Sequence, residues 1–155
     1  MEGLGAAASA VAVIELGAKV AALCLQYTLA VKNAKHEIER FRQQTEGLMA
    51  IADGAQRLLQ GPDGARLQTA QNLRNALANA RSRLDRIHTT LENKLNASRT
   101  GRAMRRMGWR ALAWPFESKD TDKIITDLQR DRDAISAALQ IDQTFVSPHK
   151  PLSRS

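Results

Sequence analysis

The sequence predicts an all-α protein, an antiparallel bundle of four to five helices with a small-residue helix at its N-terminus. Apolar residues recur at steps of three or four along most of the 155 residues, which is the spacing of one face of an α-helix. No stretch alternates between apolar and polar residues as a half-buried strand does. Glycine and proline gather at a few points that separate the helical runs.

The first long amphipathic pattern runs from Leu16 to Leu59. Its apolar positions are Leu16, Val20, Leu23, Tyr27, Ala30, Ala34, Ile38, Phe41, Thr45, Leu48, Ala52, Ala55 and Leu59. We expect one long helix here, or two nearly collinear helices. The pattern ends at residues 60–64, where Gly61 supplies a C-terminal cap and Pro62 prevents the helix from continuing.

Two further helical runs follow. The stripe of the first is Leu67, Ala70, Leu73, Leu77, Ala80, Leu84, Ile87, Leu91 and Leu95. We expect a break at residues 96–101, a weaker helical piece near Arg102, and a last helix capped by Ser118 or Asp120. The stripe of that last helix is Ile124, Ile125, Leu128, Ile135, Ala138 and Leu139. Because periodicity stops at Asp142, we assign residues 1–143 to the bundle and 144–155 to a disordered tail or linker.

The N-terminal region, residues 1–31, is apolar and rich in small residues. Residues 3–14 carry no charge, and small residues recur every four positions. This spacing lets helix backbones approach closely in lipid, although a small-residue helix can equally tuck against its own bundle. Candidate membrane-insertion residues are Gly3, Leu4, Gly5, Ser9, Val11, Val13, Ile14 and Gly17.

Membrane entry of this region is predicted to be conditional. Leu4 to Ile14 covers about 16 Å, whereas the hydrocarbon core of a bilayer is about 30 Å thick. A longer span includes Glu15 and Lys19, and a charge at the bilayer centre costs about 2.5 to 3.5 kcal/mol. Glu15 precedes Lys19 by one helical turn, the better order for an ion pair, which lowers that cost when several helices assemble.

The chain is strongly basic, with a net charge of +7, which favours acidic partners. The basic aromatic segment, residues 99–117, supplies the candidate membrane-surface residues Arg99, Arg102, Arg105, Arg106, Arg110 and Trp109. Each basic residue near anionic lipid contributes about 1 kcal/mol. Nucleic acid is not an expected partner, because no reading helix or stacking platform is recognised. In the alternative interpretation, the arginines are only solvated and Trp109, Leu112, Trp114 and Phe116 plug one end of the bundle.

No catalytic or metal motif occurs in the sequence. His36, His88 and His149 are far apart, and we find no metal-ligand, nucleotide-binding or nucleophile pattern. We therefore expect no enzyme, no cofactor and no metal site. The single cysteine, Cys24, lies in an apolar stretch and is expected to be buried in a protein of a reducing compartment.

Three stretches resemble the HeLo-like (HELL) N-terminal domain of STAND proteins, the NOD-like receptors of filamentous fungi. They are residues 3–41, the turn QRLLQGPDGARL at residues 56–67, and residues 110–143, which include WPFESKD and ALQID. The resemblance covers residues 2–143. It implies a bundle akin to the HeLo domain of fungal incompatibility proteins and to the killer four-helix bundle of mixed-lineage kinase-like pseudokinases, with a helix zipper at Gly3, Gly5, Ser9 and Gly17.

The resemblance also implies a function in programmed cell death, heterokaryon incompatibility and fungal innate immunity. A NACHT/NB-ARC-type or amyloid-motif region, C-terminal to the domain, would oligomerise it, and the N-terminal helix would then permeabilise the membrane. The expected partners are anionic lipids, further copies of the chain and that regulatory region. The expected location is cytoplasmic at rest and the plasma membrane on activation. The alternative is a non-lytic adaptor module, which predicts that Gly3, Gly5 and Gly17 tolerate bulky substitution.

Overall fold

The computed structural model describes residues 5–31, 33–62, 64, 70–100 and 113–146. Over these residues the chain forms long helices, and none of the described residues lies in a strand. The helices are α1 (Ala6–Ala30), α2 (Lys35–Leu59), α4 (Gln71–Thr100) and α6 (Ser118–Val146). The predicted all-α bundle is therefore confirmed.

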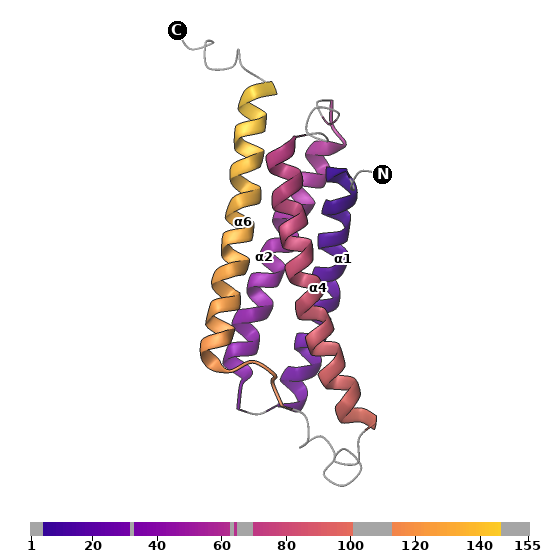
Figure 1. The fold of residues 1–155 in the computed structure, drawn as a ribbon, viewed down its shortest axis with the longest axis vertical. Coiled ribbons are helices and arrows are strands. Elements are labelled where there is room, and N and C mark those ends of the chain that lie inside the picture. The colour runs from indigo at the N-terminus through magenta and orange to yellow at the C-terminus, as the bar shows by residue number, and fades with distance from the viewer. Residues whose placement is uncertain (1–4, 32, 63, 65–69, 101–112, 147–155) are drawn as a thin grey trace.

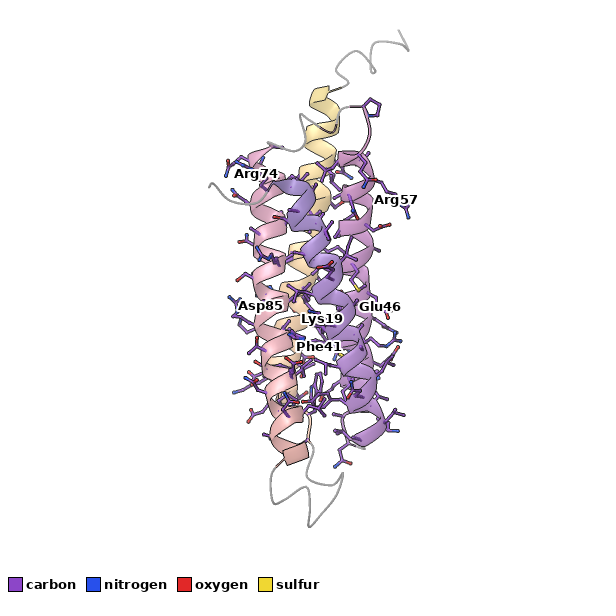
Figure 2. All side chains as sticks on the ribbon, turned by 90° about the vertical axis from the view of Figure 1, so that its right-hand side faces the viewer. Lys19, Phe41, Glu46, Arg57, Arg74 and Asp85 are labelled. Atoms are coloured by element: carbon purple, nitrogen blue, oxygen red, sulfur yellow. The ribbon has the colours of Figure 1, made fainter. Side chains whose placement is uncertain are left out.

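Successive helices alternate in direction (Figure 1). α1 packs against α2 and α4, and α6 closes the bundle by packing against the same two helices. The helices α1 and α6 thus lie on one diagonal, and α2 and α4 on the other. As a result α1 runs parallel to its neighbour α4, and α2 runs parallel to α6. Figure 2 views the bundle from the side of α1, with α4 and α2 on either side of it.

The prediction of one helix, or of two collinear helices, over residues 16–59 is wrong. α1 ends at Ala30, α2 begins at Lys35, and the two form an antiparallel hairpin. Val31 is extended, with φ −107° and ψ 127°. The apolar spacing carries across the turn because both helices direct their stripes into the same core. The only turn-favouring residue there is Asn33, and a single such residue is a weak signal.

Other helix ends also differ from the predicted ones. α4 continues through residues 96–100, where a break was expected. α6 extends to Val146, so the first three residues of the predicted tail are helical, and residues 147–155 lie outside the described part. α2 ends at Leu59 as predicted, but the glycine that this turn needs is Gly64. A Cβ atom on Gly64 would lie 1.7 Å from the carbonyl oxygen of Leu59.

The core is a seam of leucine, alanine and other aliphatic side chains between the four helices. Its larger fully buried members include Ile38, Leu48, Leu73, Leu77, Leu84, Leu91, Leu128 and Ile135. Most stripe residues of the sequence patterns are therefore confirmed as core, although Leu16 is only partly buried. Aromatic side chains gather where α1 ends and α2 and α6 begin: Tyr27, Phe41, Trp114 and Phe116.

Candidate functional site

The candidate membrane-insertion residues divide between two faces of α1. Gly3 and Leu4 lie outside the described residues. Gly5 is the N-cap of α1. Ser9, Val13 and Gly17 are buried and face the core. Val11 and Ile14 are only half-buried, and Ile14 also packs partly against the core.

The inner face of α1 is built from small residues in its N-terminal half. Ala6, Ser9, Ala10, Val13 and Gly17 are the buried residues of this half. Ala7, Ile14 and Leu16 are partly buried and also pack against the core. A Cβ atom on Gly17 would lie 2.3 Å from Cγ of Met49 on α2, so the absence of a side chain lets the two helices approach. In the folded bundle, the small-residue spacing therefore serves packing within one chain. A side chain at position 17 therefore requires Met49 to move, whether the domain is an adaptor or a membrane effector.

The C-terminal half of α1 is held by larger and more polar contacts. The Tyr27 hydroxyl donates a 2.8 Å hydrogen bond to the main-chain carbonyl of Leu91 on α4. The Tyr27 ring meets Trp114 edge-on at 5.4 Å, and Trp114 packs against Phe41 and Phe116. Nε1 of Trp114 donates to Oγ1 of Thr121 at 3.2 Å. Burial, and to a lesser extent the nearby Cys24, raises the pKa of Tyr27 to about 12.

The outer face of α1 is also apolar. Leu25 is 54% exposed and Leu29 is 87% exposed, and Ala18 and Ala22 are exposed on the same side. Apolar side chains are therefore spread round α1, whereas a surface helix usually confines them to one stripe. By length and composition α1 can cross a membrane, a test that core helices of soluble proteins also pass. Its 25 residues measure about 37 Å, so its charges, and not its length, oppose insertion.

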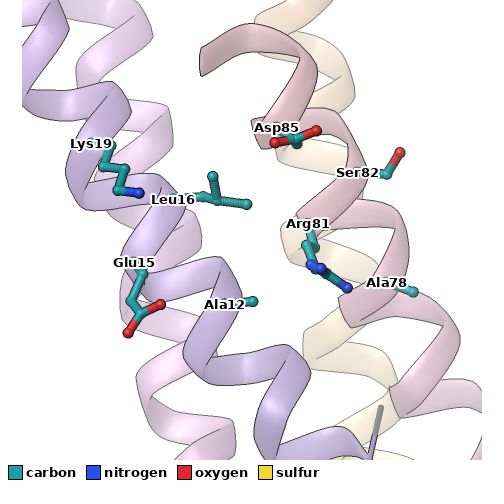
Figure 3. A pocket seen from close by; sticks show the side chains of 8 residues that line it. All are labelled: Ala12, Glu15, Leu16, Lys19, Ala78, Arg81, Ser82 and Asp85. Carbon is teal, nitrogen blue, oxygen red and sulfur yellow. The ribbon is translucent and has the colours of Figure 1, made fainter. Parts of the chain in front are cut away.

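A groove of about 480 Å³ runs along the seam between α1 and α4 (Figure 3). It is lined by Ala12, Glu15, Leu16, Lys19, Ala78, Arg81, Ser82 and Asp85. The charged residues follow the same spacing on both parallel helices, so Glu15 lies at the level of Arg81 and Lys19 at the level of Asp85. None of the ion pairs formed between described residues includes these four. The groove is thus an open seam with complementary charges on its two walls.

Of the candidate membrane-surface residues, Arg99 alone belongs to the described part of the chain. Arg102, Arg105, Arg106, Trp109 and Arg110 lie outside the described residues, and Arg99 lies in the last turn of α4. The two aromatic residues of this segment that are described pack into the bundle: Trp114 is buried and Phe116 packs against the core. The prediction that aromatic side chains plug one end of the bundle is confirmed for these two.

A partly buried ion cluster between α4 and α6 was not predicted from the sequence. Nε of Arg83 lies 2.5 Å from Asp131, and its Nη1 lies 3.3 Å from Asp127. The hydrogen bond with Asp131 raises the pKa of Arg83. A hydrogen bond from Lys123, followed by the charge of Arg83, lowers the pKa of Asp127. The partners are far apart in sequence, so no local pattern reveals the cluster.

The histidines do not form a site in the described part of the chain. His36 is exposed, and His88 lies 3.8 Å from Glu92 one turn later on the same helix. His149 lies outside the described residues. No group of three or more metal-ligating side chains occurs among the residues that the structure describes.

Comparisons with known proteins identify no relative of this chain. No family model matches the chain, and neither a curated protein nor a solved structure is similar to it.

Proposed function

We propose that this bundle is a membrane-targeting cell-death effector domain of the NOD-like receptor type, as its resemblance to HeLo-like domains suggests. Oligomerisation releases α1, which then enters and permeabilises the membrane. The observation that carries the proposal is that α1 is apolar on both faces over a length of about 37 Å, with Glu15 and Lys19 as its only charged residues. A surface helix of a soluble bundle usually confines its apolar side chains to the face that packs on the core.

The N-terminal half of α1 is held to the bundle more weakly than its C-terminal end, which supports the release of the helix. The buried residues of its N-terminal half are alanine, serine, glycine and Val13, and Ile14 and Leu16 are only partly buried. The buried residues of α2 include Ile38, Phe41 and Leu48. Each buried methylene contributes about 0.8 kcal/mol, so small side chains hold this half weakly. Tyr27 holds the other end through Leu91 and Trp114. Release therefore begins at the N-terminus of α1 and proceeds towards Tyr27.

Assembly reuses the inner face of α1 once the helix has left the bundle. The small residues at Ala6 and Ala10, and at Gly17 and Ala21, then become available for close helix packing in lipid. When several copies of α1 associate, ion pairing of Glu15 with Lys19 lowers the free-energy cost of placing these charges in the membrane. The arginines of the basic aromatic segment bind the anionic headgroups. A C-terminal NACHT/NB-ARC-type or amyloid-motif region gathers the copies, and the domain moves from the cytoplasm to the plasma membrane.

A disulfide between positions 17 and 49 tests the proposal. A Cβ atom on Gly17 would lie 3.7 Å from Cβ of Met49, within the usual range for a disulfide. The variant Gly17→Cys with Met49→Cys, in a Cys24→Ala background, therefore fastens α1 to α2 without displacing either helix. It is fused to an inducible oligomerisation module, and dye release is measured from liposomes with and without anionic lipid.

The expected result is strong leakage of anionic liposomes by Cys24→Ala alone, weaker leakage by the reduced variant because position 17 belongs to the small face, and little or none by the oxidised variant. The matched control is Cys24→Ala alone, whose leakage should be the same under both redox conditions. Equal leakage by the oxidised and reduced variant would refute the release of α1. Absence of leakage from every oligomerised form would refute a lytic function altogether.

The second candidate is a non-lytic interaction module. The packing of α1 within the bundle favours it. Ser9, Val13 and Gly17 all face the core, and Tyr27 is fastened to α4. An adaptor keeps these contacts while it recruits a partner bundle. In that case the purified oxidised variant still binds the partner bundle in solution, whereas an effector that must release α1 loses liposome leakage when oxidised.

A further inference from the structure

The outer stripe of α1, defined as Ala7, Val11, Ile14, Ala18, Ala22, Leu25 and Leu29, is a continuous apolar line along the helix. Leu25 and Leu29 are largely exposed, Ala18 and Ala22 are exposed, and the first three members are half-buried. Ala7 and Ile14 also pack partly against the core. The rest of the outer stripe is separate from the inner face of α1 that packs on the bundle. It is present in the folded protein before any release of α1.

The members of the outer stripe are arranged symmetrically about Ala18. Ile14 and Ala22 lie at equal distances along the chain on either side of it, as do Val11 and Leu25, and Ala7 and Leu29. Two copies of α1 that cross in antiparallel fashion at Ala18 therefore place each member opposite its counterpart. A large side chain meets a small one where Leu29 faces Ala7 and Ile14 faces Ala22. Ala18 itself lets the backbones approach at the centre.

Charges beside the stripe match the same arrangement. Glu15 and Lys19 flank it on the side that faces α4, one turn apart and on either side of Gly17. In an antiparallel pair, this flank of one helix meets the same flank of the other, so each Glu15 lies near Lys19 of the second copy. In a parallel two-fold pair this flank lies on opposite sides of the contact in the two copies, so Glu15 and Lys19 of different copies do not meet. Charge complementarity thus selects the antiparallel pair.

We propose that the outer stripe of α1 binds the same stripe of a second copy of this chain, in an antiparallel pair with its two-fold axis at Ala18. Such a contact is isologous and closes as a dimer. The stripe is about 33 Å long, and one helix per subunit gives an interface smaller than those of permanent dimers. The proposal does not depend on the membrane function, because the dimer needs only the folded bundle.

Cysteine crosslinking in solution tests the geometry. Ala18→Cys and Ala8→Cys are introduced separately in a Cys24→Ala background, and both positions are exposed on α1. In the antiparallel dimer the two copies of position 18 meet at the two-fold axis, whereas the two copies of position 8 are about 30 Å apart. We expect a disulfide-linked dimer from Ala18→Cys and none from Ala8→Cys. Equal crosslinking at both positions, or no crosslinking at position 18, would overturn the proposal.

Charge reversal provides the second test. Glu15→Lys places two lysines together at each end of the charged flank, and Lys19→Glu places two glutamates there. Each single reversal should lower the rate of crosslinking at position 18 by about five-fold or more. The double reversal restores opposite charges across the interface and should recover most of that rate. Failure of the double reversal to recover it, with circular dichroism showing a folded bundle, would contradict the proposed register.

Leu29→Glu separates this dimer from the membrane function. Leu29 is 87% exposed and is not part of the core, so its replacement should leave the thermal unfolding midpoint nearly unchanged. It buries a carboxylate against Ala7 of the second copy and should abolish crosslinking at position 18. Crosslinking at the rate of the parent Ala18→Cys protein would count against the interface, whatever the result of the liposome assay.

Discussion

Tyr27 and Leu91 are joined by a hydrogen bond in which the tyrosine hydroxyl donates to the leucine carbonyl at 2.8 Å. The bond ties the last turns of α1 to α4, and the Tyr27 ring packs edge-on against Trp114. At the other end of α1, Ala6 and Ala10 are fully buried but contribute only methyl groups to the core. The helix is therefore fastened at its C-terminal end and lightly held at its N-terminal end.

The first prediction concerns this hydrogen bond. Tyr27→Phe keeps the ring packing and removes only the donor, so it should lower the free energy of unfolding by about 1 kcal/mol. Chemical denaturation measures the change. The control is Thr28→Val, which removes a hydroxyl that bonds to Cys24 within the same helix and should change stability by less than about 0.5 kcal/mol. A larger loss in Thr28→Val than in Tyr27→Phe would show that the link to α4 contributes little.

The second prediction compares two helical glycines. An alanine in place of glycine stabilises a helix by about 0.5 to 1 kcal/mol. At Gly54 a Cβ atom meets nothing within 4 Å, so Gly54→Ala should show this gain. At Gly17 the added Cβ would lie 2.3 Å from Cγ of Met49, so Gly17→Ala should show no gain or a loss. The thermal unfolding midpoint measures both.

A third variant identifies the cause of that difference. In a Met49→Ala background the obstructing Cγ is absent, and Gly17→Ala should then be stabilising relative to Met49→Ala alone. The reversal of sign distinguishes a side-chain clash from a backbone effect. If Gly17→Ala remains destabilising in the Met49→Ala background, close contact with Met49 is not the reason for glycine at position 17.

The core faces of α2, α4 and α6 could be predicted from the sequence because each of these helices has one apolar face and one polar face. Phe41, Leu48, Leu84 and Leu128 are all fully buried, as the spacing indicates. The α1–α2 turn could not be found in this way. The stripe positions Ala30 and Ala34 continue the helical spacing across the turn, and neither glycine nor proline marks it.

The orientation of α1 could not be predicted because the helix is apolar on both sides. Val11 and Val13 are chemically identical, yet Val13 is fully buried and Val11 is only half-buried. Spacing of small residues locates the contact at Gly17 but does not say whether the partner is Met49 of the same chain or another copy in lipid. The pairing of Arg83 with Asp131 depends on the packing of α4 against α6, which no local pattern contains.

The third prediction concerns the partly buried ion cluster. Arg83→Met leaves the buried carboxylate of Asp131 without its cation, and should lower the free energy of unfolding by about 2 kcal/mol. The control is Arg40→Met, which breaks an exposed pair with Asp122 and should change stability by less than about 1 kcal/mol. Urea denaturation at neutral pH compares the two. Equal losses would mean that the burial of Asp131, which is 5% exposed, has no energetic consequence.

The fourth prediction concerns acid stability. The pKa of Asp127 is lowered in the folded protein, chiefly by the hydrogen bond from Lys123. A lowered pKa adds stability above the unfolded value, about 3.8 for a free aspartate, and this contribution is lost as the pH falls through the folded pKa. Asp127→Asn should therefore be less stable than the parent at pH 7 and equal to it at about pH 2. The control is Asp133→Asn, on the exposed side of α6, which should follow the parent over the whole range.

The last prediction uses Cys24 as a probe of α1. Burial raises the pKa of its thiol to about 12, with the carboxylates of Glu39 and Glu46 acting in the same direction and Arg42 opposing them. Since only the thiolate reacts, iodoacetamide at pH 8 should alkylate the folded protein at least about 1,000-fold more slowly than the unfolded chain. Labelling then requires α1 to open, so Tyr27→Phe should speed it about five-fold and Thr28→Val should not. If Cys24 in the folded protein reacted as fast as an exposed thiol, the seating of α1 against α2 would be wrong.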